Sequence, residues 1–188
     1  YKIKSAVKHP FLDFSTLKKR NRALLNELAL NRRTARQLYL EVIPITVGDK
    51  GEFLLGGQGE PKEWALVMRR FDQTRLYDRM AEEGRLPISV MPKLAQVIAD
   101  LHREANRFLA PETSLAALRA ALEDNETALA GEEDACPADA LATVNRGSRE
   151  TLSALALLLQ ARASGGYVRH CHGDLHLRNI VEIDGAPV

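Results

Sequence analysis

A short segment near the end of the 188-residue chain carries the residue types that phosphoryl transfer requires. It reads His172-Gly173-Asp174-Leu175-His176-Leu177-Arg178-Asn179 and fits the pattern H-x-D-x-x-x-x-N. In this pattern the Asp174 carboxylate accepts or orients a hydroxyl proton, and the Asn179 side-chain oxygen binds a nucleotide-bound Mg²⁺. Asp174 and Asn179 are five positions apart, which is more than one helical turn. We therefore expect both in a tight loop that follows a helix and precedes a strand at residues 180–183.

The histidines of this loop are further candidates for the catalytic group. We expect His172 to brace the loop through hydrogen bonds rather than to transfer protons. His176 either approaches the acceptor or contacts neighbouring backbone, and both roles stay open. Arg178 is interpreted as a solvated loop residue, although a guanidinium here could also stabilise the charge of a transferred phosphate.

This loop resembles the H-G-D-x-H-x-x-N motif of aminoglycoside phosphotransferases and their kinase-like relatives. Tyr1-Lys2-Ile3-Lys4, residues 11–17 and residues 30–33 further resemble a bacterial branch of bifunctional phosphotransferase and ATP-binding proteins, in which a P-loop domain usually follows. The resemblance implies an α+β, protein kinase-like fold of two lobes. Residues 1–70 would form a small strand-rich lobe with one long helix, and residues 71–188 a mostly helical lobe. It also implies ATP and Mg²⁺ as cofactors and a small-molecule hydroxyl as the acceptor.

The resemblance also predicts parts of the site that this chain lacks. We expect the glycine-rich hairpin upstream of Tyr1 and a second metal-binding aspartate beyond Val188. Asp184 does not fit that second role because Asp184-Gly185 reads as a turn. We therefore expect the fragment alone to be inactive and assign activity to the intact protein.

Lys2 and Lys4 are the candidates for the lysine that contacts the nucleotide phosphates. Lys2 is preferred because Tyr1-Lys2-Ile3 matches an apolar-Lys-apolar strand pattern, and Lys4 would face the same way two residues later. Glu27 follows on a predicted helix and could hold the lysine toward the phosphates. The plainer alternative is two exposed strand lysines and an ordinary glutamate on a helix surface.

Residues 65–71 join the two predicted halves and resemble the hinge that offers backbone groups to the adenine edge in kinase-like folds. Met68 and Arg69 are the candidates for these contacts. Backbone contacts leave little trace in a sequence, so an internal strand that simply ends here is an equally good interpretation.

Hydrophobic periodicity predicts strands and helices in the order of a kinase-like fold, with no internal repeat. A helix starting with Ser15 as its N-cap should run to about Leu38. Strands are predicted at residues 1–7, 40–47, 51–55 and 63–69, and later helices at residues 74–83, 90–108, 115–129 and 139–163, the last with a possible break near Gly147. Gly56-Gly57-Gln58-Gly59 is interpreted as a hairpin turn, because no helix follows it to complete a phosphate loop.

Composition excludes several classes of protein. The first 36 residues carry ten Lys or Arg against two acids, and we interpret seven of the basic residues as the solvated face of one helix: Lys18, Lys19, Arg20, Arg22, Arg32, Arg33 and Arg36. Residues 123–139 are interpreted as an acidic solvated loop or an exposed helical end. We expect no nucleic-acid binding, since no aromatic residues alternate with the basic ones. No apolar run reaches the roughly 18 residues that span a membrane. Two cysteines and no recognisable leader favour the cytoplasm.

Two other functions are alternatives to phosphoryl transfer. Residues 170–176 approach the H-x-H-x-D-H ligand run of zinc-dependent hydrolases, but Leu175 separates Asp174 from His176, and that motif leaves Asn179 unexplained. The second alternative is a non-catalytic, kinase-like module that binds a nucleotide or another ligand. The presence of both Asp174 and Asn179 favours the enzyme.

Overall fold

The structure is a computed structural model that describes residues 1–9, 12–130 and 137–188. Contacts group these residues into two compact units, residues 1–104 together with 172–188, and residues 105–171. All sequence-predicted site residues fall in the first unit. Helices and strands are mixed along the chain, which makes it an α+β protein. The predicted boundary between lobes at residue 70 stays a prediction.

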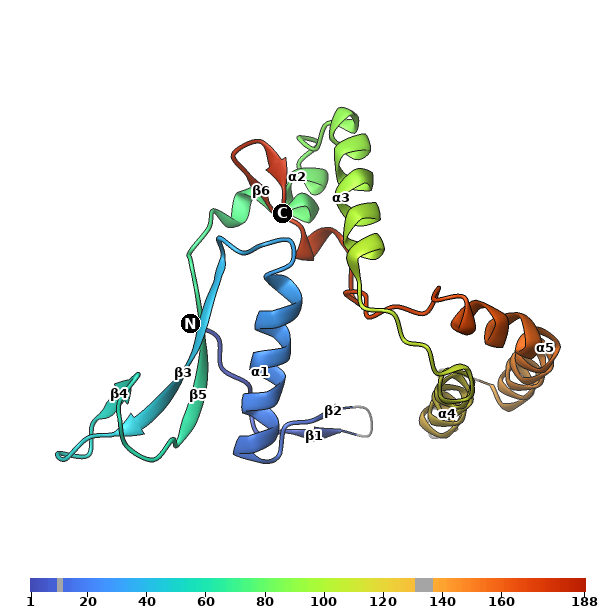
Figure 1. The fold of residues 1–188 in the computed structure, drawn as a ribbon, viewed down its shortest axis with the longest axis horizontal. Coiled ribbons are helices and arrows are strands. Elements are labelled where there is room, and N and C mark those ends of the chain that lie inside the picture. Colours follow the sequence, from blue (N-terminus) through green and yellow to red (C-terminus); the bar gives the residue numbers. More distant parts are fainter. Residues whose placement is uncertain (10–11, 131–136) are drawn as a thin grey trace. The chain divides into compact units, whose positions relative to one another are not determined.

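An antiparallel sheet forms the centre of the first half of unit 1 (Figure 1). Its strands are β3 (Tyr39–Val47), β4 (Phe53–Leu55) and β5 (Glu63–Met68), in the order β4-β3-β5. They confirm the three predicted strands to within two residues at each end. Residues 56–59 are not a hairpin turn, however, because they lead from β4 to β5 and both of these strands pair with β3. A Cβ on Gly57 would lie 2.0 Å from Thr46 Oγ1, so this crossing needs a glycine.

Helix α1 (Leu17–Asn31) lies along this sheet and contacts β3 and β5 (Figure 1). Its N-cap is Thr16, whose hydroxyl accepts a hydrogen bond from the Lys19 N–H, while the predicted cap, Ser15, donates to Asp13 instead. The helix also ends seven residues before the predicted Leu38. Residues 32–38 form turns that bury Leu38 in a separate cluster.

The residues before α1 form less regular structure than predicted. Residues 1–7 contribute an isolated antiparallel bridge between Lys2 and Leu66 rather than a full strand. Two short strands that the sequence did not reveal, β1 (Lys8–His9) and β2 (Leu12–Asp13), pair with each other. The bridge places the Lys2 backbone directly beside β5, with the Lys2 N–H 2.9 Å from the Leu66 carbonyl.

The interpretation of the basic residues as one solvated helix face is wrong for several of them. Arg20 is only 8% exposed, and its Nε donates to Glu63 Oε2 on β5 at 2.8 Å. Its Nη1 donates to the Phe14 carbonyl at 2.9 Å. Arg32, Arg33 and Arg36 lie beyond the end of α1. Lys18 and Arg22 are exposed on the helix.

The second half of unit 1 is helical, with the end of the chain folded against it. It contains 3₁₀ turns at Gln73–Arg75, Ile88–Val90 and Leu177–Asn179, the helices α2 (Tyr77–Glu82) and α3 (Met91–Glu104), and the strands β6 (Glu182–Ile183) and β7 (Ala186–Pro187). The Tyr77 N–H donates to the Ile180 carbonyl at 2.9 Å, and their side chains share a core cluster with Met80. This packing holds the chain against α2 directly after residues 172–179.

Unit 2 contains a pair of antiparallel helices, α4 (Pro111–Leu129) and α5 (Ala138–Ser164). Glu126 on α4 accepts from Arg149 on α5, and Glu112 accepts from Gln160, which fixes the antiparallel direction. Helix α5 runs through Gly147 without the predicted break. Part of the predicted acidic segment, residues 131–136, lies outside the described residues. None of the helices in the described ranges is long and apolar enough to cross a membrane.

Candidate active site

The loop that carries Asp174 depends on a glycine for its path. Gly173 has a φ of 79°, a left-handed conformation that side-chain-bearing residues rarely adopt. After this turn the chain runs to the 3₁₀ turn Leu177–Asn179, so the predicted loop is present and ends in a short turn rather than a strand. The strand begins later, at Glu182.

Asn179 and Asp174 are joined by hydrogen bonds across the loop. Asn179 Nδ2 donates to the Asp174 backbone carbonyl at 2.8 Å and to Asp174 Oδ2 at 3.2 Å. Among the residues that the structure describes, none donates a hydrogen bond to Asn179 Oδ1, and the Asp174 side chain is 78% exposed. An amide oxygen and a carboxylate are the hard oxygen donors that Mg²⁺ prefers. The donor set therefore fits the metal that the sequence predicts.

Both histidines of the loop accept backbone hydrogen bonds. His172 Nδ1 accepts from the Asp174 N–H and His176 Nδ1 from the Arg178 N–H, each at 3.3 Å. The other ring nitrogen, His176 Nε2, lies 3.6 Å from Asp174 Oδ1 and 3.2 Å from Asn179 Nδ2. The structure thus places His176 against neighbouring backbone and beside the Asp174 carboxylate, while its approach to an acceptor stays a prediction.

Arg178 contacts an acid that sequence reasoning missed. Its Nε lies 3.5 Å from Oδ2 of Asp78, in the first turn of α2. Asp78 is well covered, whereas Arg178 is largely exposed. Nothing in the spacing of the sequence links residues 78 and 178, because the contact depends on how α2 packs against the loop.

Lys2, Lys4 and Glu27 come together on one side of α1. Lys2 Nζ lies 2.7 Å from Glu27 Oε1, and Lys4 Nζ lies 2.7 Å from Glu27 Oε2. Burial raises the pKa of the Glu27 carboxyl, but the hydrogen bonds from both lysines oppose this and hold the pKa below its ordinary value. Glu27 is therefore an ionised carboxylate that pairs with both candidate lysines.

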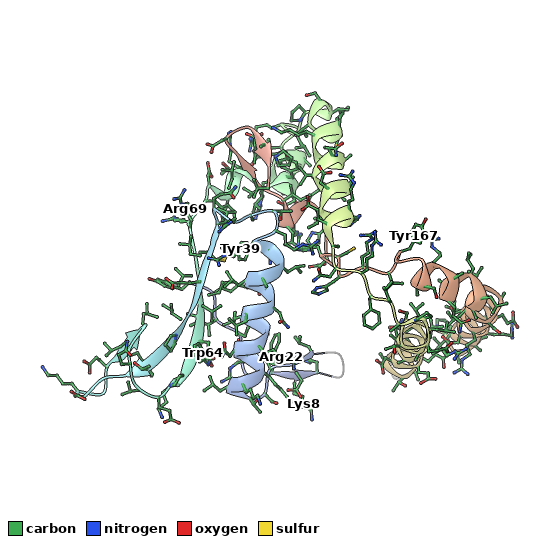
Figure 2. All side chains as sticks on the ribbon, in the orientation of Figure 1. Lys8, Arg22, Tyr39, Trp64, Arg69 and Tyr167 are labelled. Carbon is green, nitrogen blue, oxygen red and sulfur yellow. The ribbon has the colours of Figure 1, made fainter. Side chains whose placement is uncertain are left out.

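The predicted hinge is the end of β5. Met68 is the last residue of this strand and pairs with Tyr39, and the Arg69 N–H donates to the Leu38 carbonyl at 2.8 Å. Figure 2 shows Arg69 and Tyr39 at this end of the sheet. Because the Arg69 N–H is already used, a ligand here would have to bind other backbone groups.

A pocket of about 570 Å³ follows the hinge directly, lined by Arg70, Phe71, Asp72 and Gln73. Asp72 accepts from the N–H and the hydroxyl of Thr74, and these hydrogen bonds lower the pKa of its carboxyl. Phe71 supplies the aromatic ring of this lining, and the other three residues are polar or charged. Arg70 and Phe71 belong to the predicted hinge at residues 65–71, whereas Asp72 and Gln73 were not among the predicted site residues.

The zinc alternative finds no support in the geometry. Within residues 1–9, 12–130 and 137–188, no three His, Cys, Asp or Glu side chains gather as a metal site. The histidines at positions 172 and 176 instead accept hydrogen bonds from the loop backbone.

Comparison with known proteins identifies the chain's relatives. A family model described as "Phosphotransferase enzyme family" matches residues 15–185. Uncharacterized proteins of Mycobacterium bovis and Mycobacterium tuberculosis are 28% identical over 191 residues, which cover 100% of this chain and 36% of each relative. The chain thus spans about a third of the length of these curated relatives. No solved structure matches the chain.

Proposed function

Because this chain belongs to the phosphotransferase enzyme family, we propose that it carries the catalytic loop of an ATP-dependent small-molecule kinase. The reaction would transfer the γ-phosphoryl group of ATP to a hydroxyl group. The observation that carries this proposal is the Asp174–Asn179 pair, in which Asp174 holds the Asn179 amide nitrogen and no described residue donates to the amide oxygen.

Each residue of the loop has a defined task in this proposal. The exposed Asp174 carboxylate orients the acceptor hydroxyl and takes up its proton as the bond to phosphorus forms. His172 and His176 hold the backbone at residues 174 and 178. Asn179 Oδ1 would hold Mg²⁺, which neutralises charge on the phosphate oxygens when it is bound.

The nucleotide would lie along the end of β5. Lys2 is the proposed phosphate ligand and Glu27 the carboxylate that orients it, as their 2.7 Å contact supports. Backbone groups near Met68 and Arg69, with the pocket at residues 70–73, would receive the adenine end. This placement requires only residues of unit 1.

The properties of the whole protein extend this proposal. Its acceptor would be a small molecule rather than a nucleic acid, and it would act in the cytoplasm rather than at a membrane. The relatives' greater length leaves room for the P-loop domain of the bifunctional branch. A screen of hydroxyl compounds is the direct way to identify the acceptor.

Transfer of ³²P from the γ-position of ATP to an acceptor, measured with the full-length protein, tests the proposal. Counting label in the acceptor rather than ATP loss avoids interference from a second ATPase domain. Asp174→Asn should lower transfer by about 10²- to 10⁴-fold, the contribution of a positioned general base, while Mg·ATP binding changes little.

Asp184→Asn is the matched control. Asp184 lies in the turn between β6 and β7 with a φ of 50°, which asparagine tolerates well, so this variant should transfer phosphate like the wild type. Equal transfer by Asp174→Asn and wild type would contradict the catalytic assignment. A wild-type protein that binds Mg·ATP but labels no compound in a broad screen would instead favour a non-catalytic binding module.

A further inference from the structure

Two lysines share one carboxylate beside the proposed phosphate site. Glu27 offers one oxygen to Lys2 and the other to Lys4, each at 2.7 Å. Residues 2 and 4 lie two positions apart in the segment before α1, and both side chains reach Glu27 on this helix. A single lysine would be sufficient to neutralise Glu27, so the second one needs its own explanation.

The two lysines differ in their surroundings. The Lys4 side chain is 19% exposed, and its Nζ also lies over the Phe14 ring, 5.5 Å from the ring centre. The Lys2 side chain is 49% exposed, and among the described residues its ammonium has only the contact with Glu27. Lys4 is therefore held by two contacts, while Lys2 has one contact and is open to a ligand.

Glu27 itself is poorly solvated, with only 15% of its side chain exposed. If Lys2 alone neutralised it, movement of the Lys2 ammonium toward a phosphate would leave a half-buried carboxylate without a counter-ion. An unpaired charge in such a position is strongly unfavourable. Glu27 would then compete with the phosphates for Lys2. Lys4 removes this competition because it keeps the carboxylate paired.

We propose that Lys4 is a positioning residue that stays on Glu27 and thereby allows the Lys2 ammonium to be shared between Glu27 and the phosphates of ATP. The two lysines, which the sequence offered as alternatives, have separate tasks. This inference rests on the proposed function, because it assumes that Lys2 is the phosphate ligand. It predicts that Lys4 acts on nucleotide affinity, through Lys2, rather than on the chemical step.

The test compares Lys4→Met and Lys4→Arg in the full-length protein, with the Kd of Mg·ATP measured by calorimetry and kcat and KM measured by phosphate transfer. Lys4→Met should raise the Kd and KM for ATP roughly tenfold, a typical coupling between neighbouring charged groups, with kcat nearly unchanged. Lys4→Arg retains the positive charge and should restore most of the affinity. Lys8→Met, at an exposed strand lysine labelled in Figure 2, is the control and should bind like the wild type.

A double variant separates positioning from simple structural support. In Lys4→Met, the uncompensated Glu27 captures Lys2, so adding Glu27→Gln should lower the Kd for ATP relative to Lys4→Met alone. A merely structural Lys4 would give a double variant no better than the single one. An unchanged Kd in Lys4→Met, or a loss confined to kcat, would also overturn the inference while the kinase proposal stands. If the wild-type protein does not bind Mg·ATP, both the proposed function and this inference fail.

Discussion

Glu27 links the proposed nucleotide site to the stability of the fold, because its ionisation depends on two lysines that contact it only in the folded chain. Its pKa is lower in the folded protein than the ordinary value of 4.5. The unfolded chain therefore binds more protons in this pH range. The resulting stabilisation is fully present above about pH 4.5 and is lost as the pH falls through the lower, folded pKa.

Replacing Glu27 by Gln should remove this part of the acid sensitivity. Urea unfolding of the variant, measured from about pH 6 down to pH 3, should show a shallower loss of unfolding free energy than the wild type. Glu60→Gln is a useful comparison, since the hydrogen bond from Lys62 also lowers the pKa of the exposed Glu60 carboxyl. The change in acid sensitivity caused by Glu60→Gln should disappear in 1 M salt. The change caused by Glu27→Gln, at a half-buried carboxyl, should largely remain. Identical salt sensitivity at both positions would argue against this account.

For individual residues, the sequence predicted which side chains belong to the candidate site better than it predicted which other side chains they contact. The spacing from Asp174 to Asn179 indicated a loop, and the structure joins these two side chains. It could not show that Lys2 and Lys4 share Glu27, because that depends on the rotation of α1 relative to the preceding segment. The Asp78–Arg178 contact was likewise beyond prediction, since it depends on packing between segments 100 residues apart in sequence.

The position of α1 on the sheet is fixed by a buried ion pair as well as by apolar packing. Arg20 near the start of α1 binds Glu63 at the start of β5, and it also donates to the Phe14 carbonyl. Because Glu27 lies two turns further along the same helix, this anchor also determines where Glu27 meets the lysines.

Arg20→Met should therefore be strongly destabilising. Removing one partner of a buried pair leaves the other charge uncompensated, which costs about 3 kcal/mol or more. Urea unfolding monitored by the single tryptophan, Trp64 on β5, would measure the change. The matched control is Lys62→Met, which breaks an exposed pair with Glu60 and should cost less than about 1 kcal/mol. A similar cost for both variants would show that Arg20 is not an anchor.

Tertiary packing explains why the predicted length of this helix was wrong. Apolar residues continue at helical spacing as far as Leu38, and no glycine or proline interrupts residues 32–38. The helix nevertheless ends at Asn31, because Ala35 and Leu38 pack in turns against Val181 near the end of the chain. The error in α5 was the opposite one, because the sequence predicted a possible break near Gly147 and the helix continues through this residue. Gly147 has open space around it, and a single glycine is tolerated inside a helix.

At the scale of the whole molecule, unit 1 consists of two stretches of chain that are far apart in sequence. A buried cluster of Ala35, Leu38 and Val181 joins them. The Val181 N–H and carbonyl also form a pair of 2.9 Å hydrogen bonds with Val188. The stability of the segment after the catalytic loop therefore depends on residues that lie near position 35.

Leu38→Ala tests this dependence. Truncating a buried leucine should cost about 2–5 kcal/mol, and amide hydrogen exchange should accelerate at residues 180–188 as well as around residue 38. Leu157→Ala is the matched control, because Leu157 on α5 is 81% exposed and its truncation should change stability by no more than about 0.5 kcal/mol. Faster exchange confined to residues near 38 would contradict the proposed dependence.

The division of unit 1 between two stretches also has a consequence for biosynthesis. A ribosome releases residues 1–104 first and residues 172–188 only after all of unit 2 has been made. Throughout that interval, the nascent chain exposes Leu38, Tyr77 and Met80 without the partners Ile180 and Val181 that cover them in the finished protein. Uncovered apolar surface of this kind is what molecular chaperones bind and what drives aggregation. Residues 172–188, which carry Asp174 and Asn179, are thus also the segment that covers this apolar surface once it has been synthesised.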